Sequence, residues 1–200
     1  MANEKSYLAL GDSYTIGEAV EQEESFPFQL TQLLNDKGRQ FEQPKVIAKT
    51  GWTTDELRHA IQQEQIAETF DLVTLLIGVN NQYRGYSQET YRNEFAELLE
   101  TAISFAGGKK ENVYVVSIPD WGVTEFAKNS GRDLQTISDE IDAFNRINAQ
   151  ETAAQNVAYA DITPGSRQAI KKQNLIASDG LHPSGKMYAE WAALIAEKIH

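Results

Sequence analysis

Short runs of apolar residues alternate along this chain with longer segments in which apolar residues recur every three or four positions. The short runs have the length of buried strands and are bounded by glycines or polar residues. They cover residues 7–10, 46–48, 72–77, 113–116 and 157–160. The run over 72–77 is the most apolar and β-branched and stops at Gly78, so it predicts a central strand.

The segments with helical spacing predict five helices between and after these strands. Each has one apolar face, and several begin at a capping residue or stop at a glycine. They run from 25 to the glycine at 38, over 53–64, from 87 to the glycines at 107 and 108, over 134–147 and over 184–199. Strands that alternate with such helices predict βαβ units, hence a three-layer α/β/α sandwich around a parallel sheet. No linker or repeat divides the chain, so we expect one domain over 1–200.

Charge narrows the range of partners. The chain of 200 residues carries 18 basic and 29 acidic side chains, for a formal net charge of −11. This charge repels phosphate backbones and anionic lipid, and adjacent basic residues occur only at 109–110 and 171–172, so no nucleic-acid partner is predicted. No apolar stretch approaches the roughly 20 residues that span a bilayer, so stable membrane insertion is not expected either.

The chain has no cysteine, which excludes disulfides, thiolate metal sites and cysteine nucleophiles. Its three histidines lack clustered carboxylates, and no glycine-rich phosphate loop follows a strand, so we expect neither a metal nor a cofactor. His59 and His200 are expected on the surface. Residues 1–5 lead into the first strand without a signal-peptide core, which predicts a cytoplasmic location, or a periplasmic or secreted one if a signal peptide has been removed.

Polar residues suited to catalysis follow the predicted strands at one edge of the sheet. Substrates of open parallel sheets bind beyond the carboxyl ends of the strands, so the turns found there hold the candidate site residues. Those turns are Gly11-Asp12-Ser13-Tyr14, Lys49-Thr50-Gly51-Trp52 and Gly78-Val79-Asn80-Asn81, together with Asp179-Gly180-Leu181-His182 before the last predicted helix. They contain the residue types of a serine hydrolase.

A serine hydroxyl becomes a good nucleophile when a base removes its proton and a third group orients that base. Ser13 and His182 are the predicted nucleophile and base. Asp179, three residues before His182, is placed to accept the Nδ1 hydrogen bond and leave Nε2 facing Ser13. Asp12 is predicted to orient the nucleophile turn through hydrogen bonds to its own backbone, which is a structural task.

Acyl transfer also needs N–H donors where the oxyanion develops, each contributing roughly 3 kcal/mol to lowering the barrier. The Ser13 amide, the Gly51 amide and the Asn80 side chain are suitable donors. Gly51 also leaves room for a substrate carbonyl because it has no Cβ.

The four turns resemble, in order, the conserved blocks of the GDSL family, whose members are also called SGNH hydrolases. Ser13, Gly51, Asn80 and His182 match the four residues of that second name. Two positions depart from the family pattern, because Tyr14 stands where Leu is usual and Asn81 where Asp is usual. The resemblance implies a flavodoxin-like five-stranded sheet of order 2-1-3-4-5 and a metal-free acyl-enzyme mechanism on small-molecule esters, either lipid-like or acetylated sugars.

Four aromatic residues fall in predicted loops near this edge, where their rings either line an acyl or sugar pocket or cover the core. They are Trp52, Tyr83, Trp121 and Phe126. The loops over 82–87 and 119–131 are expected to set the shape of the pocket. A carbohydrate O-deacetylase or an acyltransferase would use the same triad. A non-catalytic module that binds a small ligand on the same fold is the alternative from another class, and the oligomeric state stays open.

Overall fold

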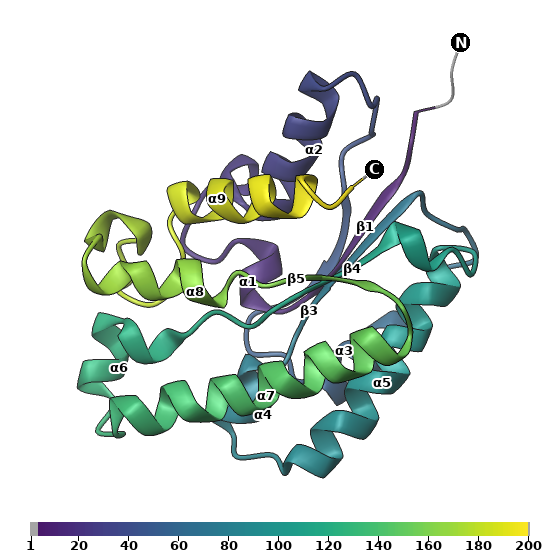
Figure 1. The fold of residues 1–200 in the computed structure, drawn as a ribbon. Coiled ribbons are helices and arrows are strands. Elements are labelled where there is room, and N and C mark those ends of the chain that lie inside the picture. Colours follow the sequence, from purple (N-terminus) through teal and green to yellow (C-terminus); the bar gives the residue numbers. More distant parts are fainter. Residues whose placement is uncertain (1–3, 200) are drawn as a thin grey trace.

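Five parallel strands form the centre of the structure, a computed structural model that describes residues 4–199 (Figure 1). They are β1 (Tyr7–Gly11), β2 (Lys45–Ala48), β3 (Leu72–Leu76), β4 (Val113–Val116) and β5 (Ala158–Ala160). Their spatial order is β2-β1-β3-β4-β5, which confirms the predicted sheet. In the register, Leu10 lies opposite Ile47 on one side and opposite Leu75 on the other. Residues 1–3 and His200, to which two of the expectations above refer, lie outside the described residues.

Helices cover both faces of the sheet. The longer ones are α2 (Phe26–Asp36), α3 (Thr54–Glu64), α5 (Gln88–Phe105), α7 (Leu134–Ala154) and α9 (Gly185–Ala196). The short ones are α1 (Ser13–Ile16), α4 (Val79–Tyr83), α6 (Glu125–Asn129) and α8 (Thr163–Ser166), with 3₁₀ turns η1 (Gln22–Glu24), η2 (Lys110–Asn112), η3 (Trp121–Val123), η4 (Arg167–Ile170) and η5 (Gln173–Leu175). Figure 1 shows α2 and α9 side by side on one face and α3, α5 and α7 on the other, which is the predicted three-layer sandwich.

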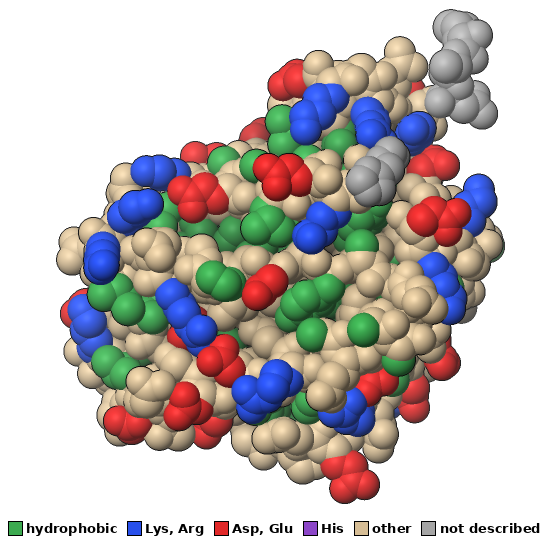
Figure 2. Space-filling view, viewed as in Figure 1, with side chains coloured by type: hydrophobic (Ala, Val, Ile, Leu, Met, Phe, Trp, Pro, Cys, Tyr) green, Lys and Arg blue, Asp and Glu red, His purple; other side chains and the backbone are tan. Residues whose placement is uncertain are grey.

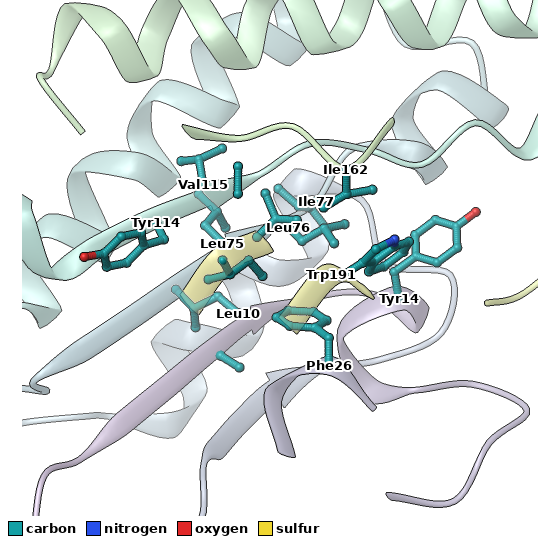
Figure 3. Close-up of a cluster of buried hydrophobic side chains, with 14 of the residues drawn as sticks. Leu10, Tyr14, Phe26, Leu75, Leu76, Ile77, Tyr114, Val115, Ile162 and Trp191 are labelled. Atoms are coloured by element: carbon teal, nitrogen blue, oxygen red, sulfur yellow. The ribbon is translucent and has the colours of Figure 1, made fainter. Parts of the chain in front are cut away.

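The core fills the space between the sheet and its two helical layers (Figure 3). Leu10, Leu75 and Val115 come from the three inner strands, and each is fully buried. On the face covered by α2 and α9, the rings of Phe26 and Trp191 pack 6.3 Å apart between centroids. Each such side chain contributes about 1.5 to 3 kcal/mol by burial, so the strands that carry the site form a rigid base.

The structure differs from the predicted elements where helices are short or where polar residues face the core. Helices α1, α4 and α6 occupy segments predicted as loops, since four or five residues cannot show a helical period. Helix α7 extends seven residues beyond the predicted end at Ile147, because Asn148 and Thr152 are buried and break the apolar pattern. The Asn148 side chain accepts a hydrogen bond from Tyr91 Oη at 2.7 Å, which satisfies its carbonyl oxygen in the core.

The surface mixes charged and apolar side chains. On the face shown in Figure 2, hydrophobic side chains are visible between acidic and basic ones. Several large apolar side chains of the described residues stay exposed; they are Ile16, Tyr83, Phe126, Leu134 and Ile170. Within residues 4–199 no helix combines the length and the apolar character needed to cross a membrane.

Candidate active site

Ser13 lies at the first position of α1, directly beyond the carboxyl end of β1, and its side chain is almost buried. Gly11 makes this sharp turn possible, because a Cβ there would lie 2.1 Å from Thr15 Oγ1 and 2.4 Å from the Leu76 carbonyl oxygen. Asp12 caps the helix and accepts the Tyr14 N–H through Oδ1 at 3.0 Å. The predicted structural role of Asp12 is therefore confirmed.

Asp12 is also an unusual carboxyl group for its position. It is fully buried, and its Oδ2 has no hydrogen-bond partner within the described residues. Burial raises the pKa of Asp12 from 3.8 to about 7, although the hydrogen bond from the Tyr14 N–H acts in the opposite direction. A group that changes charge near neutral pH thus lies next to Ser13.

The loop before α9 holds Asp179 and His182 in direct contact. Asp179 Oδ2 lies 2.5 Å from His182 Nδ1, and Asp179 Oδ1 accepts the N–H groups of Leu181 and His182 at 3.0 Å each. Burial alone would raise the pKa of Asp179, but the hydrogen bonds from His182 and from the two backbone N–H groups outweigh it and lower the pKa. Since an ionised carboxylate only accepts, the proton sits on Nδ1 and Nε2 of the neutral imidazole is left as an acceptor.

Tyr14 connects this loop with the Ser13 turn. The rings of Tyr14 and His182 meet edge to face with their centroids 5.8 Å apart, and Tyr14 also packs against Trp191 of α9. No hydrogen bond joins the Ser13 hydroxyl to His182 in the part of the chain that the structure describes. Such contacts are often long without substrate and shorten when it binds.

Gly51 lies in a tight turn after β2. The Trp52 N–H donates to the Lys49 carbonyl at 3.2 Å, and Gly51, the third residue of the turn, has a φ of 88°. These values define a type II turn, in which glycine is strongly favoured at this position. The Gly51 N–H has no acceptor among residues 4–199, so it is available to a ligand.

Asn80 lies in α4, beyond the carboxyl end of β3, and its side chain reaches the Gly51 turn. Its Nδ2 donates one hydrogen to the Trp52 carbonyl at 2.9 Å, which leaves the second amide hydrogen available. Arg84, one helical turn later, donates to the Gly51 carbonyl at 2.6 Å. The structure therefore brings the Gly51 turn and Asn80 together at one edge of the sheet.

The fold and the arrangement of the candidate site agree with a protein-family match that covers most of the chain. A model of the GDSL-like lipase/acylhydrolase family matches residues 9–190. The chain belongs to this family. It is a hydrolase that acts on ester bonds. Comparison with curated proteins gave no match.

Solved structures of similar fold cover nearly all of this GDSL hydrolase. TesA is 18% identical with a TM-score of 0.74, over 97% of each chain. The lipase/acylhydrolase from Enterococcus faecalis is 24% identical with a TM-score of 0.72, over 98% of this chain and 95% of its own. A variant of Axe2, an acetyl-xylooligosaccharide esterase from Geobacillus Stearmophilus, is 17% identical with a TM-score of 0.73, over 98% and 94%. These likenesses establish a shared fold.

The aromatic candidates of the hydrolase have different environments. Trp121 is only 2% exposed, so it covers the core, and its Nε1 donates to Gln82 Oε1 at 2.8 Å. Tyr83 and Phe126 pack against the Trp121 ring and are partly exposed. The expectation that these three lie in loops was wrong, because they belong to α4, η3 and α6. Trp52 is half-buried and lines a surface groove along α3.

A cleft of about 620 Å³ adjoins the Asp179 loop of the hydrolase. Ala177 and Gly180 of that loop form part of its wall. Its apolar lining includes Val123, Leu134, Ala169, Ile170 and Ile176. Ser13 and His182 are not among the lining residues, and the cleft reaches the Asp179 loop only through Ala177 and Gly180.

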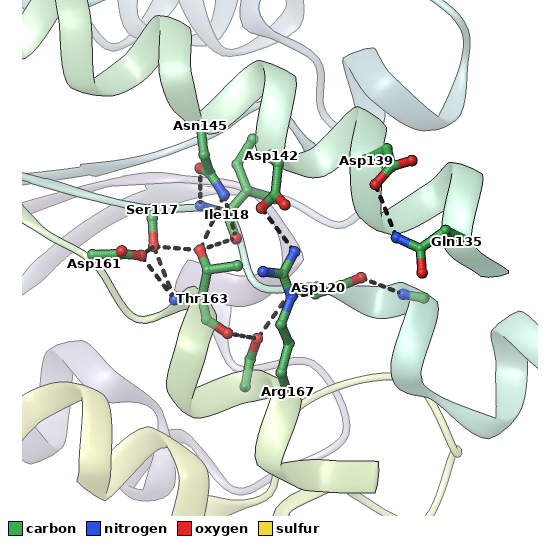
Figure 4. Close-up of polar contacts among 12 residues, drawn as sticks. Ser117, Ile118, Asp120, Gln135, Asp139, Asp142, Asn145, Asp161, Thr163 and Arg167 are labelled. Carbon is green, nitrogen blue, oxygen red and sulfur yellow. Dashed lines mark hydrogen bonds and ion pairs between the residues drawn. The ribbon is translucent and has the colours of Figure 1, made fainter.

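A polar network joins the segment before Trp121 to α7 and η4 (Figure 4). The Asn145 side chain binds both backbone groups of Ile118. Its Oδ1 accepts the Ile118 N–H at 2.8 Å, and its Nδ2 donates to the Ile118 carbonyl at 2.9 Å. Arg167 donates to Asp120 at 2.8 Å and to Asp142 at 2.7 Å. Asp120 in turn accepts the Gly122 N–H, so the network fixes the backbone on both sides of Trp121.

Sequence reasoning missed Gln82, Arg84 and the Asp120–Arg167 pair as residues that hold the site. Arg84 lies four positions after Asn80, a spacing that places both on one face of a helix, so recognition of α4 would have revealed it. The contact between Asp120 and Arg167 joins segments 47 residues apart and carries no local signal. Within residues 4–199 no group of three or more His, Asp or Glu side chains is arranged to hold a metal ion.

Proposed function

We propose that the chain is a serine esterase in which Ser13, His182 and Asp179 act as a catalytic triad. The observation that carries this proposal is the Asp179–His182 pair, which keeps a proton on Nδ1 and leaves Nε2 as a base. His182 Nε2 takes the Ser13 proton as Oγ attacks the ester carbonyl, and then gives that proton to the leaving alcohol. Water repeats the sequence on the acyl-enzyme and releases the carboxylic acid.

The oxyanion formed in each step accepts hydrogen bonds from the Ser13 amide, the Gly51 amide and the free Asn80 hydrogen. Two features support this role: the Gly51 N–H has no other acceptor among the described residues, and one Asn80 hydrogen stays available. Removing a donor of this kind costs about 3 to 4 kcal/mol of barrier stabilisation, or 100- to 1,000-fold in kcat.

The substrate is a small ester whose apolar part lies against the exposed side chains beside the triad. The cleft next to the Asp179 loop, with Leu134 and Ile170 in its wall, favours an aliphatic acyl or alcohol group. The same triad serves a carbohydrate O-deacetylase, and the structurally similar Axe2 is an acetyl-xylooligosaccharide esterase. Partly exposed aromatic rings such as Tyr83 favour that second candidate, because sugars stack on aromatic faces.

Hydrolysis of p-nitrophenyl acetate, butyrate and octanoate by the wild type and by Ser13→Ala tests the proposal. Acetate release from acetylated xylo-oligosaccharides is measured in parallel. We expect Ser13→Ala to lose at least about 1,000-fold in kcat while its circular dichroism stays unchanged. Preference for butyrate or octanoate supports the aliphatic substrate, and preference for the acetylated sugar supports the deacetylase.

A fluorophosphonate probe separates the enzyme from a binding module. The probe phosphonylates an activated serine, so we expect labelling of the wild type and none of Ser13→Ala. A folded wild type that neither reacts with the probe nor hydrolyses any of these esters would show that the triad is not functional.

A further inference from the structure

Asn81 is fully buried and ties α4 to the start of α3. Its Oδ1 accepts the Thr54 N–H at 3.1 Å, and its Nδ2 donates to Thr54 Oγ1 at 2.6 Å. Thr54 is also fully buried and lies three residues after Gly51, whereas Asn81 directly follows Asn80. The Asn81–Thr54 pair therefore sets the spacing between the segments that carry Gly51 and Asn80.

The hydrogens around Thr54 explain why an amide stands at position 81. The Thr54 hydroxyl has one proton, and it donates that proton to the Glu94 carboxylate of α5. The hydroxyl oxygen can then only accept, so the group at position 81 must be a donor. Asn81 supplies that donor, and an ionised aspartate would not.

An aspartate at position 81 would create a conflict between two carboxylates. The new carboxylate and that of Glu94 would both face the hydroxyl of Thr54, which has one proton for two acceptors. The Thr54 oxygen would then face one of the two carboxylates without a hydrogen between them. The segments that carry Gly51 and Asn80 would move apart as a result. A shift of this kind moves Asn80 relative to Gly51, and displacements near 1 Å at a reacting centre cost up to about 100-fold in rate.

On the basis of the proposed function, we infer that Asn81 is a positioning residue matched to Glu94. Through Thr54 the two side chains hold the Gly51 turn and Asn80 at the spacing that the oxyanion requires. Neither Asn81 nor Glu94 touches the reacting atoms. In this hydrogen-bond relay Asn81 donates to Thr54 and Thr54 donates to Glu94, because the Glu94 carboxylate can only accept. The direction of donation reverses when the carboxylate and the amide exchange places.

Exchange of the two groups tests this inference. Asn81→Asp is expected to lower kcat for p-nitrophenyl butyrate by about 10- to 100-fold with little change in KM, and to lower Tm. Glu94→Gln alone is expected to keep wild-type kcat, because the amide oxygen of the new glutamine still accepts the Thr54 proton. In the double variant that glutamine donates through Nε2 to Thr54 Oγ1, and Thr54 donates to the carboxylate at position 81. We therefore expect kcat and Tm to recover to within about threefold and a few degrees of the wild type.

Glu97→Gln is the matched control, since Glu97 lies one turn further along α5, is exposed and pairs with Arg58 of α3. It should not rescue Asn81→Asp. Recovery of neither kcat nor Tm in the Asn81→Asp/Glu94→Gln double variant would overturn the inference, and so would an unaffected Asn81→Asp. Recovery of Tm without kcat would refute the positioning role. Absence of Ser13-dependent turnover in the wild type would instead refute the proposed function, and Tm would still decide whether positions 81 and 94 are matched.

Discussion

Replacement of Asp12 by Asn should change how the stability of the protein depends on pH. Asp12 is fully buried beside the nucleophile, and burial raises its pKa from 3.8 to about 7. A carboxyl whose pKa is raised by folding contributes most stability below the unfolded-state pKa, and this contribution is lost as pH rises to the folded-state pKa. A difference of about 3 in pKa corresponds to roughly 4 kcal/mol, lost between about pH 4 and pH 7.

Asn keeps the Oδ1 acceptor for the Tyr14 N–H and has no charge to bury. The free energy of unfolding of Asp12→Asn should therefore lie within about 1 kcal/mol of the wild type at pH 4, where both side chains are neutral in the folded state, and exceed it by up to about 4 kcal/mol at pH 8. Urea unfolding followed by circular dichroism at pH 4, 5, 6, 7 and 8 measures the difference, and an unchanged m value keeps the comparison valid.

Asp133→Asn is a control of opposite sign. Asp133 is an exposed cap of α7, and hydrogen bonds from the Thr136 hydroxyl and N–H lower its pKa. Its contribution is present above its unfolded-state pKa and is lost as pH falls, so this variant should lose stability relative to the wild type as pH rises. Parallel stability curves for the wild type and Asp12→Asn between pH 4 and 8 would refute the reasoning about burial.

Three further changes test the triad loop and the two ends of α4. Asp179→Asn should lower kcat by about 1,000- to 10,000-fold: the Leu181 and His182 N–H groups hold Oδ1, so the new amide donates to His182 Nδ1 and moves the proton to Nε2. A loss below tenfold with p-nitrophenyl butyrate would contradict this tautomer argument. Gly85→Ala should cost about 1 to 2 kcal/mol by thermal unfolding, since its φ is 73° but the space around it is open. Gly78→Ala should cost at least about 2 kcal/mol more than Gly85→Ala, because its Cβ would lie 2.3 Å from Tyr91 Oη. That contact would break the Tyr91 hydrogen bonds to Ile77 and Asn148. Equal costs at the two glycines would disprove the clash.

Local patterns were sufficient for the strands and for the candidate triad loop. The apolar runs over 7–10, 72–77 and 113–116 match β1, β3 and β4 within one residue, because burial on both faces requires an unbroken apolar run. The Asp179–His182 contact could be predicted because it spans three residues within one turn. The sheet order came from the family resemblance, since strand pairing over long separations leaves no local pattern.

The contacts that hold the site together depend on the tertiary structure. The Asn81–Thr54–Glu94 relay joins three helices, and Arg84 meets Gly51 only because α4 packs beside the turn after β2. Trp121 belongs to the core because its indole N–H finds Gln82 there, which no spacing in the sequence indicates. The sequence by itself determined the strands, the long helices and the residue types of the site, since these depend on burial and on neighbours along the chain. Only the tertiary structure decided how polar side chains pair, because each pairing satisfies donors and acceptors that folding brings together from distant segments.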